Sequence, residues 1–252
     1  QTMQIIFGLK LGRTRSWLMA PAFGLAVISL LGMVLNQAGI PFESFSQWLF
    51  IITSLAGIGI LFRKKAYAPR GLGKWVTILI GILLLCGWPL LIYNSSWVGY
   101  GNDDMTNYCL GAERFLRHGF YDIPQPDELA GGEYAQLYWM LSVAGQIRFG
   151  SEQLLAYVAG ITGLKTTAVF MSTLLAFALA QVTSIMALAG GAISGRRAAL
   201  IAAITLGVAP LWHAGISYQL IAQVAGLSLL TAALVLVART RFPGSRQGQI
   251  RW

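Results

Sequence analysis

Long apolar stretches separated by short polar segments form the main pattern of this chain. A helix needs about 20 apolar residues to cross the hydrocarbon core of a bilayer. Five or six stretches meet this requirement, at residues 17–36, 45–62, 74–93, 166–190, 198–215 and 216–238. Pro210 and Gly215 separate the last two, so we expect a tight turn within residues 212–217. The pattern predicts an all-α fold, a polytopic transmembrane helical bundle of about six spans.

The one long polar gap, residues 94–165, is expected to have structure of its own, because structureless loops of this length are uncommon. Apolar or small residues recur there at helical spacing between residues 105 and 116, with Glu113, Arg114 and Arg117 on the opposite face. This spacing predicts an amphipathic helix over 103–118. Two later apolar runs, 134–149 and 154–164, are too short to span a membrane. We expect them to be interfacial or re-entrant helices packed against the spans.

Composition supports a membrane protein over a soluble one. Hydrophobic residues make up 56% of the chain and charged residues 11%, whereas a soluble domain carries about 25% charged residues. These values exclude a soluble, disordered or disulfide-stapled protein. The net charge of +9 would suggest nucleic acid in a polar chain, but in a membrane chain basic residues mark the cytoplasmic side. We therefore expect membrane lipids as partners, and no nucleic acid.

The positions of the charges agree with one topology. With a cytoplasmic N-terminus, 14 of the 18 basic residues fall in cytoplasmic segments, which contain no acidic residue. The other four basic residues and all nine acidic ones fall outside, which leaves +14 inside and −5 outside. The sequence thus predicts a single integral membrane domain over 1–252. Three spans lie within 1–93, the outer loop is 94–165, three more spans lie within 166–238, and a basic cytoplasmic tail covers 239–252.

Two adjacent acidic residues, Asp103 and Asp104, begin the predicted amphipathic helix. Acidic residues at a helix start cap its free N–H groups and complement its dipole. A carboxylate at the membrane–water boundary can instead accept a proton from a hydroxyl or bind a divalent cation such as Mg²⁺ or Mn²⁺. The residues alone leave both interpretations open. His118, which precedes Gly119, is interpreted as a helix-end residue rather than a catalytic base.

The outer loop carries a recognisable pattern. The segment WVGYGNDD (97–104) follows a span and precedes the spacing YxxxAxxFLxxG (108–119). Together they resemble the first outer loop of the GT-C-type polytopic membrane glycosyltransferases, in particular bacterial relatives of the protein O-mannosyltransferase and aminoarabinose transferase group. The resemblance covers roughly residues 75–240. It implies sugar transfer from a polyprenyl-phosphate donor, outside a bacterial inner membrane, with Asp103 or Asp104 as general base or metal ligand.

A phosphate-linked donor also requires a cation, and four outside residues can supply one. These substrate-binding candidates are Arg114, Arg117, Arg148 and Lys165. Members of the superfamily usually have about twice as many spans, so the alternative is a non-catalytic integral membrane subunit of a larger complex, derived from such a fold. A transporter or channel is disfavoured, because the predicted spans contain almost no ionisable residues.

Overall fold

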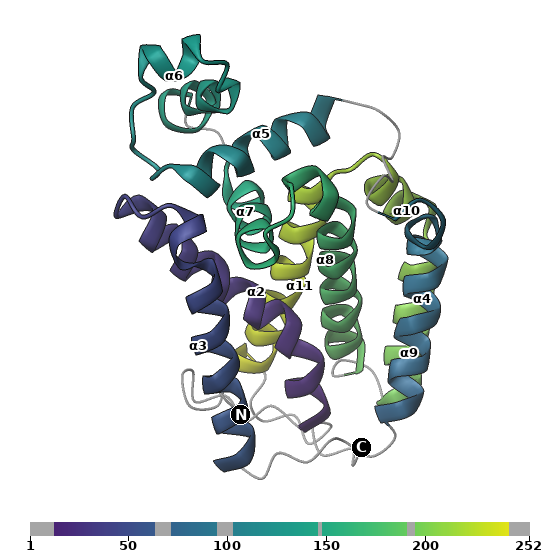
Figure 1. Ribbon diagram of the computed structural model, residues 1–252. Helices are drawn as coiled ribbons and strands as arrows, with labels where there is room; N and C mark the ends of the chain where they lie inside the picture. Colours follow the sequence, from purple (N-terminus) through teal and green to yellow (C-terminus); the bar gives the residue numbers. More distant parts are fainter. Residues whose placement is uncertain (1–12, 64–71, 95–102, 146–147, 191–194, 242–252) are drawn as a thin grey trace.

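The structure of the protein is a computed structural model that describes residues 13–63, 72–94, 103–145, 148–190 and 195–241. Within these ranges the chain is helical and contains no β-strand, as the apolar pattern predicted. Long helices stand side by side, and shorter helices cover one end of them (Figure 1). We name this covering layer the cap. It comprises α5 (Asp103–Arg117), α6 (Pro126–Ala130), η2 (Tyr134–Leu137) and η3 (Met140–Ala144).

Five of the described helices are long and apolar enough to cross a membrane. They are α2 (Arg13–Gln37), α3 (Phe42–Arg63), α4 (Leu72–Tyr93), α8 (Thr166–Ala189) and α11 (Ile221–Arg241). Each of these helices matches one predicted span, with its ends displaced by a few residues. The prediction was based on long apolar runs ended by basic or turn-forming segments. These five runs do form long helices, so this part of the prediction is confirmed.

The predicted span over 198–215 is broken. Its residues form α9 (Arg196–Gly207) and α10 (Pro210–Ser217), which are bent by 53°. Pro210 has no N–H to donate and disfavours helical geometry at Ala209, which is extended. The tight turn predicted near 212–217 is displaced toward the C-terminus, because α10 continues to Ser217 and the chain turns at Gln219, whose φ is +62°. The described chain thus contains five candidate spans, or six if the bent pair crosses as one.

Helix α8 lies at the centre of the bundle. Its apolar window is 78% buried, the largest share among the candidate spans. It packs against α2, α4, α9 and α11, and near the cap it also contacts α5 and α7 (Gly150–Thr162). Small side chains such as Ala178 and Ala187 are buried in these contacts and allow neighbouring helices to approach closely. The cap therefore rests on the most enclosed of the five candidate spans.

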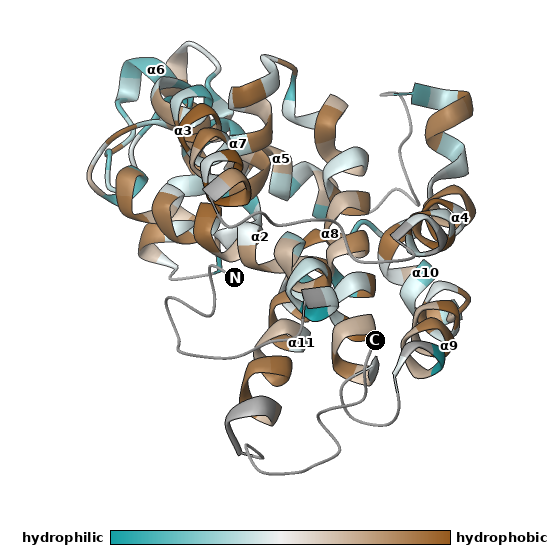
Figure 2. Cartoon of the chain, turned by 90° about the horizontal axis from the view of Figure 1, so that it is seen from below, coloured by the Kyte–Doolittle hydropathy of each residue, from teal (hydrophilic) through white to brown (hydrophobic). Residues whose placement is uncertain are grey.

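The peripheral helices direct apolar side chains outward. Only 17% of the apolar window of α3 and 22% of that of α4 is buried, and Trp48, Phe62 and Leu91 are exposed. Hydrophobic residues follow the long helices in the view from below (Figure 2). Such extensive apolar surface is rare on soluble proteins and suits a hydrocarbon environment. This arrangement is consistent with an integral membrane protein.

The second apolar run, 154–164, packs against the spans α2, α3 and α8, as predicted, whereas η2 of the first run, 134–149, packs against α5 and α6 of the cap. The run 134–149 forms the short turns η2 and η3 instead of one helix. The run 154–164 belongs to α7, which is largely buried among α2, α3, α5 and α8. A surface-lying helix would expose one side, so the extensive burial of α7 places it inside the fold.

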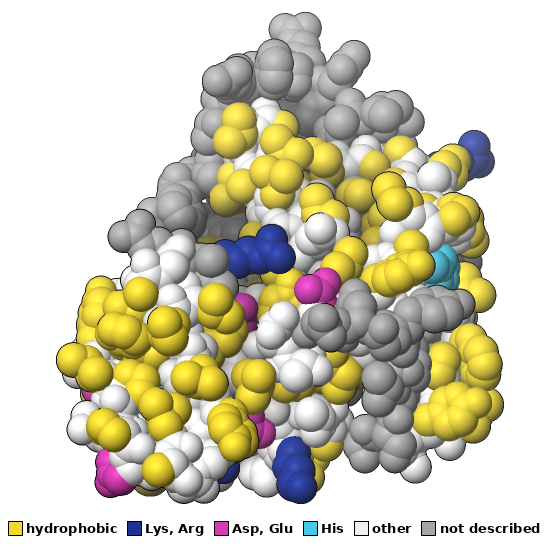
Figure 3. Space-filling view, turned by 90° about the horizontal axis from the view of Figure 1, so that it is seen from above, with side chains coloured by type: hydrophobic (Ala, Val, Ile, Leu, Met, Phe, Trp, Pro, Cys, Tyr) yellow, Lys and Arg dark blue, Asp and Glu magenta, His cyan; other side chains and the backbone are white. Residues whose placement is uncertain are grey.

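Charges of opposite sign separate along the bundle. Apart from Arg114, Arg117, Arg148 and Lys165 at the cap end, the described basic residues lie at the helix ends opposite the cap, including Arg15 in α2, Arg63 in α3, Arg197 in α9 and Arg241 in α11 (Figure 1). The acidic positions lie at the cap end, and the view onto that end shows acidic and basic side chains among apolar ones (Figure 3). Six other basic residues of the predicted cytoplasmic segments lie outside the described residues: Lys10, Lys64, Lys65, Arg70, Arg246 and Arg251.

Candidate functional site

Arg114 connects the C-terminal end of α5 to the following loop through hydrogen bonds. Its side chain is fully buried, and its guanidinium donates to the carbonyl oxygens of Gly119 (3.0 Å) and Asp122 (2.5 Å). Burial lowers the pKa of Arg114 to about 10, so the side chain is still charged at neutral pH. Arg114 was predicted as a phosphate-binding cation, but here its terminal nitrogens bind the backbone of its own loop.

The same loop joins the cap to the bundle through Asn36 at the end of α2. The Asn36 Nδ2 donates to the carbonyl of His118 (3.0 Å), and the Asn36 carbonyl accepts from the N–H of Phe120 (2.9 Å). Gly119 lies directly on Gly39, since a Cβ built on Gly119 would be 2.6 Å from the Gly39 Cα. Gly39 also has a φ of +87°, which only glycine adopts readily. This junction fixes the C-terminal end of α5 on the bundle.

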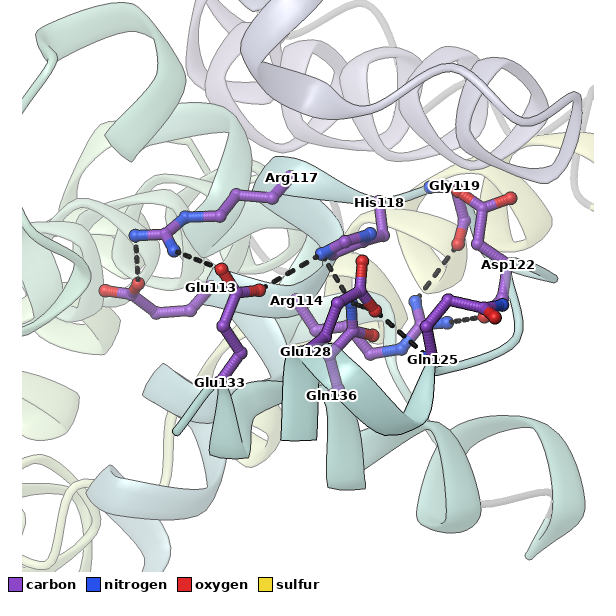
Figure 4. A network of polar contacts seen from close by, with 10 residues as sticks. All are labelled: Glu113, Arg114, Arg117, His118, Gly119, Asp122, Gln125, Glu128, Glu133 and Gln136. Carbon is purple, nitrogen blue, oxygen red and sulfur yellow. Dashed lines mark hydrogen bonds and ion pairs between the residues drawn. The ribbon is translucent and has the colours of Figure 1, made fainter. Parts of the chain in front are cut away.

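A cavity of about 260 Å³ opens beside this end of α5. Arg117 lies between Glu113 (3.7 Å) and Glu133 (3.9 Å), and His118 lies 3.8 Å from Glu133 (Figure 4). Gln136 contacts His118 and donates to Glu128 at 3.0 Å. The cavity is lined by Leu110, Glu113, Arg114, Arg117, His118 and residues 132–136. Sequence reasoning placed Arg117 and His118 at a helix end, and their convergence with Glu133 depends on the fold of the cap.

A second polar cluster lies nearer the N-terminal end of α5. Arg148 donates to the hydroxyl of Tyr108 at 3.2 Å. Burial raises the pKa of Tyr108, the charge and hydrogen bond of Arg148 lower it, and the charges of Glu152 and Asp104 raise it. Asp104 lies one helical turn before Tyr108 on the same face of α5. Asp104 and Arg148, both predicted as site residues, are thus brought to the same tyrosine.

Glu152 forms the buried part of this second cluster. It is 2% exposed and accepts hydrogen bonds from the hydroxyls of Tyr138 and Ser151, the latter at 2.6 Å. Burial and the neighbouring Glu152 carboxylate raise the pKa of Tyr138, so this phenol stays protonated. Gly111 makes room for the pair, because a Cβ there would lie 2.7 Å from the Tyr138 ring and 2.8 Å from Glu152. Sequence reasoning counted Glu152 only as an outer charge, although an acid within an apolar run is itself a signal of function or burial.

The remaining predicted site residues are placed as follows. Asp103 is the first residue of α5, and its side chain lies outside the described residues, as does most of the WVGYGNDD segment. Lys165 is exposed just before α8, next to Thr166, whose hydroxyl donates to Glu113 at 3.0 Å. The structure therefore gathers Asp104 with Arg148, and Arg117 with His118, at two different places along α5.

The described side chains include no group of three or more histidine, cysteine, aspartate or glutamate residues close enough to hold a metal ion. Both cysteines, Cys86 and Cys109, are buried free thiols, as their separation in depth predicted.

Comparison of the chain with protein-family models, with curated proteins and with solved structures finds no match. The likeness to the GT-C-type glycosyltransferases therefore rests on the residues of the outer loop described above.

Proposed function

We propose that the protein is a membrane glycosyltransferase that moves a sugar from a polyprenyl-phosphate donor to an acceptor at the cap end of the bundle. One observation carries the proposal. Asp104 and Arg148, which are far apart in the sequence, both act on Tyr108 at the end of α5 that follows the α4 span. A carboxylate and an exposed guanidinium are the two charged groups that sugar transfer from a phosphate-linked donor requires.

The chemistry assigns one step to each of these groups. The Asp104 carboxylate accepts the proton of an acceptor hydroxyl while the hydroxyl oxygen attacks the anomeric carbon of the sugar. The bond between that carbon and the donor phosphate oxygen breaks, and the electron pair leaves with the polyprenyl phosphate. The Arg148 guanidinium compensates the charge that develops on this leaving group. Asp103 is the second candidate for the base, and Tyr108 positions Arg148 through their hydrogen bond.

A divalent cation fits this arrangement as a partner of the donor. Mg²⁺ commonly binds through one or two carboxylates together with substrate phosphate oxygens, and Mn²⁺ accepts the same oxygen ligands. Asp104, with Asp103 beside it, would supply the protein ligands, and the ion would supply charge compensation for the phosphate.

The proposed location is a bacterial inner membrane, with the cap on the outer side and both chain termini in the cytoplasm. Support comes from the basic residues at the helix ends opposite the cap, which is the side that lysine and arginine mark. The outward apolar surfaces of α3 and α4 would contact membrane lipids and the prenyl chain of the donor.

The test is transfer from a radiolabelled polyprenyl-phosphate sugar in membranes that contain the protein. We expect Asp104→Asn and Arg148→Gln each to lower the transfer rate by about 100-fold or more, the usual contribution of a positioned base or a charge-stabilising group. The matched controls are Asp127→Asn, on exposed α6, and Arg197→Gln, exposed at the opposite end of the bundle. Native transfer rates in both test variants would refute the proposal, and Asp103→Asn measured in parallel decides which aspartate is the base.

The second candidate function is that of a non-catalytic integral membrane subunit packed against other membrane proteins. It is favoured by the engagement of Arg114 and Arg117, two of the four predicted phosphate cations, in contacts within the cap. Purification from native membranes as a stoichiometric complex, together with no measurable transfer, would support this second function over the first.

A further inference from the structure

Two residues that line the cavity beside the C-terminal end of α5 each have a buried polar atom with no hydrogen-bond partner. Arg114 is fully buried and its Nε has no acceptor, while Gln136 is 2% exposed and its Oε1 has no donor. Both residues line the cavity. A buried polar group without a partner costs about 1–3 kcal/mol, so such groups in a native fold require an explanation. One N–H donor and one carbonyl acceptor together suit a ligand that both accepts and donates hydrogen bonds.

The charges that line the cavity cancel one another. Glu113 and Glu133 oppose Arg114 and Arg117, so the charges of these four side chains sum to zero. The ion pairs of Arg117 are 3.7 and 3.9 Å long, whereas direct hydrogen bonds between charged groups are about 2.7–2.9 Å. The guanidinium and carboxylate edges therefore keep hydrogen-bonding capacity for a third group. A charged ligand would have to separate an ion pair, and a neutral hydroxyl would not.

The size and aromatic content of the cavity further restrict the kinds of ligand that it can bind. A water needs only about 10–15 Å³, and drug-sized ligands occupy pockets of about 300 Å³ or more. The cavity of about 260 Å³ therefore fits a single small ring. Tyr134 contributes to the lining and is 67% exposed, so its ring offers an apolar face beside the polar groups. Hydrogen-bond donors and acceptors in the same cavity as an aromatic ring match the hydroxyl groups and the C–H face of a sugar.

We propose that this cavity binds a neutral sugar ring, either free or at the end of a glycan. The carboxylates of Glu113 and Glu133 accept hydrogen bonds from sugar hydroxyls, and the Arg117 guanidinium donates to them. On binding, the side chains of Arg114 and Gln136 turn toward the cavity, so that Arg114 Nε donates to one further hydroxyl and Gln136 Oε1 accepts from it. This site lies at the opposite end of α5 from Asp104 and does not rest on the proposed function.

The test measures binding of neutral methyl glycosides of hexoses and pentoses to the full chain by saturation-transfer difference NMR. The micelles are of an amine-oxide detergent, because maltoside detergents carry sugars that would compete. We expect the native chain to bind at least one glycoside, and Tyr134→Ala to weaken that binding about tenfold or more. The matched control is Tyr121→Ala, a tyrosine of the cap that is 59% exposed and outside the cavity lining, which should change binding less than twofold.

Glu133→Gln is the second test variant, because it removes an acceptor without changing side-chain size. It should also weaken glycoside binding, and unchanged elution and thermal unfolding would show that the variants are folded. The inference is overturned if no glycoside binds, if Tyr134→Ala binds as well as the control, or if phosphate or phosphoethanolamine binds in preference to every glycoside. Asp104→Asn should bind glycosides normally. Native transfer rates in Asp104→Asn and Arg148→Gln, together with retained glycoside binding, would refute the transferase and leave the sugar site standing.

Discussion

The contact between Gly119 and Gly39 should control how firmly the cap is held on the bundle. In Gly119→Ala, the new methyl group would lie 2.6 Å from the Gly39 Cα and 2.9 Å from its carbonyl carbon. Carbon atoms normally approach to about 3.5–4.0 Å, so the two backbone segments must separate by about 1 Å. Neither segment can avoid the clash by a side-chain rotation, because the atoms involved belong to the backbone.

The expected cost follows from what the separation breaks. Crowding a packed contact costs about 1–3 kcal/mol. The bonds from Asn36 to His118 and from Phe120 to Asn36 span the same junction, and each is worth about 0.5–1.5 kcal/mol. Separation of the two backbone segments relieves part of the crowding while it stretches these hydrogen bonds, so the two costs are not fully additive. We expect Gly119→Ala to lower the free energy of unfolding by about 2–4 kcal/mol.

The assay is reversible denaturant unfolding of the full chain in mixed micelles. The control is Gly150→Ala at the start of α7, where a built Cβ meets nothing within 4 Å and φ is not positive. This control should leave the free energy of unfolding unchanged or slightly raised. Equal stability of native protein and Gly119→Ala would show that the Gly119–Gly39 contact does not fix the cap, and the reasoning would fail.

Two further predictions use the same unfolding assay. Tyr138→Phe should cost about 1.5–3 kcal/mol, because Glu152 loses a buried donor. Since the folded-state pKa of Tyr138 is raised above its usual value near 10, native stability should fall as pH rises above 10, and this variant should show a smaller fall. Arg114→Met should cost about 3–5 kcal/mol by leaving carbonyl groups buried without donors, with partial recovery in Arg114→Lys. The exposed Arg197→Met is its control, and an equal cost for both methionine variants would contradict this explanation.

The candidate spans and α5 could be predicted because each depends on a local pattern of apolar residues. The spacing from residue 105 to 116 predicted a helix over 103–118, and α5 covers Asp103–Arg117. Apolar length identified five helices in the same way. The fifth predicted span was broken because hydropathy measures the apolar content of a segment and is insensitive to the backbone geometry that Pro210 imposes. Turn positions near a proline therefore needed the structure.

The candidate sites were predictable only in part, because they depend on contacts between distant segments. Arg114 was assigned to the solvent-facing side of α5, yet the loop through Asp122 folds back over that side and buries it. Glu152 was counted as an outer charge, yet α7 carries it into the fold beside Tyr138. No periodicity within one segment encodes such folding back, whereas the place of Asp104 at a helix start is a local property that the sequence could predict.

The two functional hypotheses can fail separately because they lie at opposite ends of one rigid element. Asp104 and Arg117 are 13 residues apart in α5, which at 1.5 Å per residue is about 20 Å. Effects at sites more than about 7–10 Å apart usually add. Asp104→Asn and Glu133→Gln should therefore affect transfer and sugar binding independently. Coupling between them would instead require α5 to move as a whole, and the junction of Gly119, Gly39 and Asn36 opposes that movement.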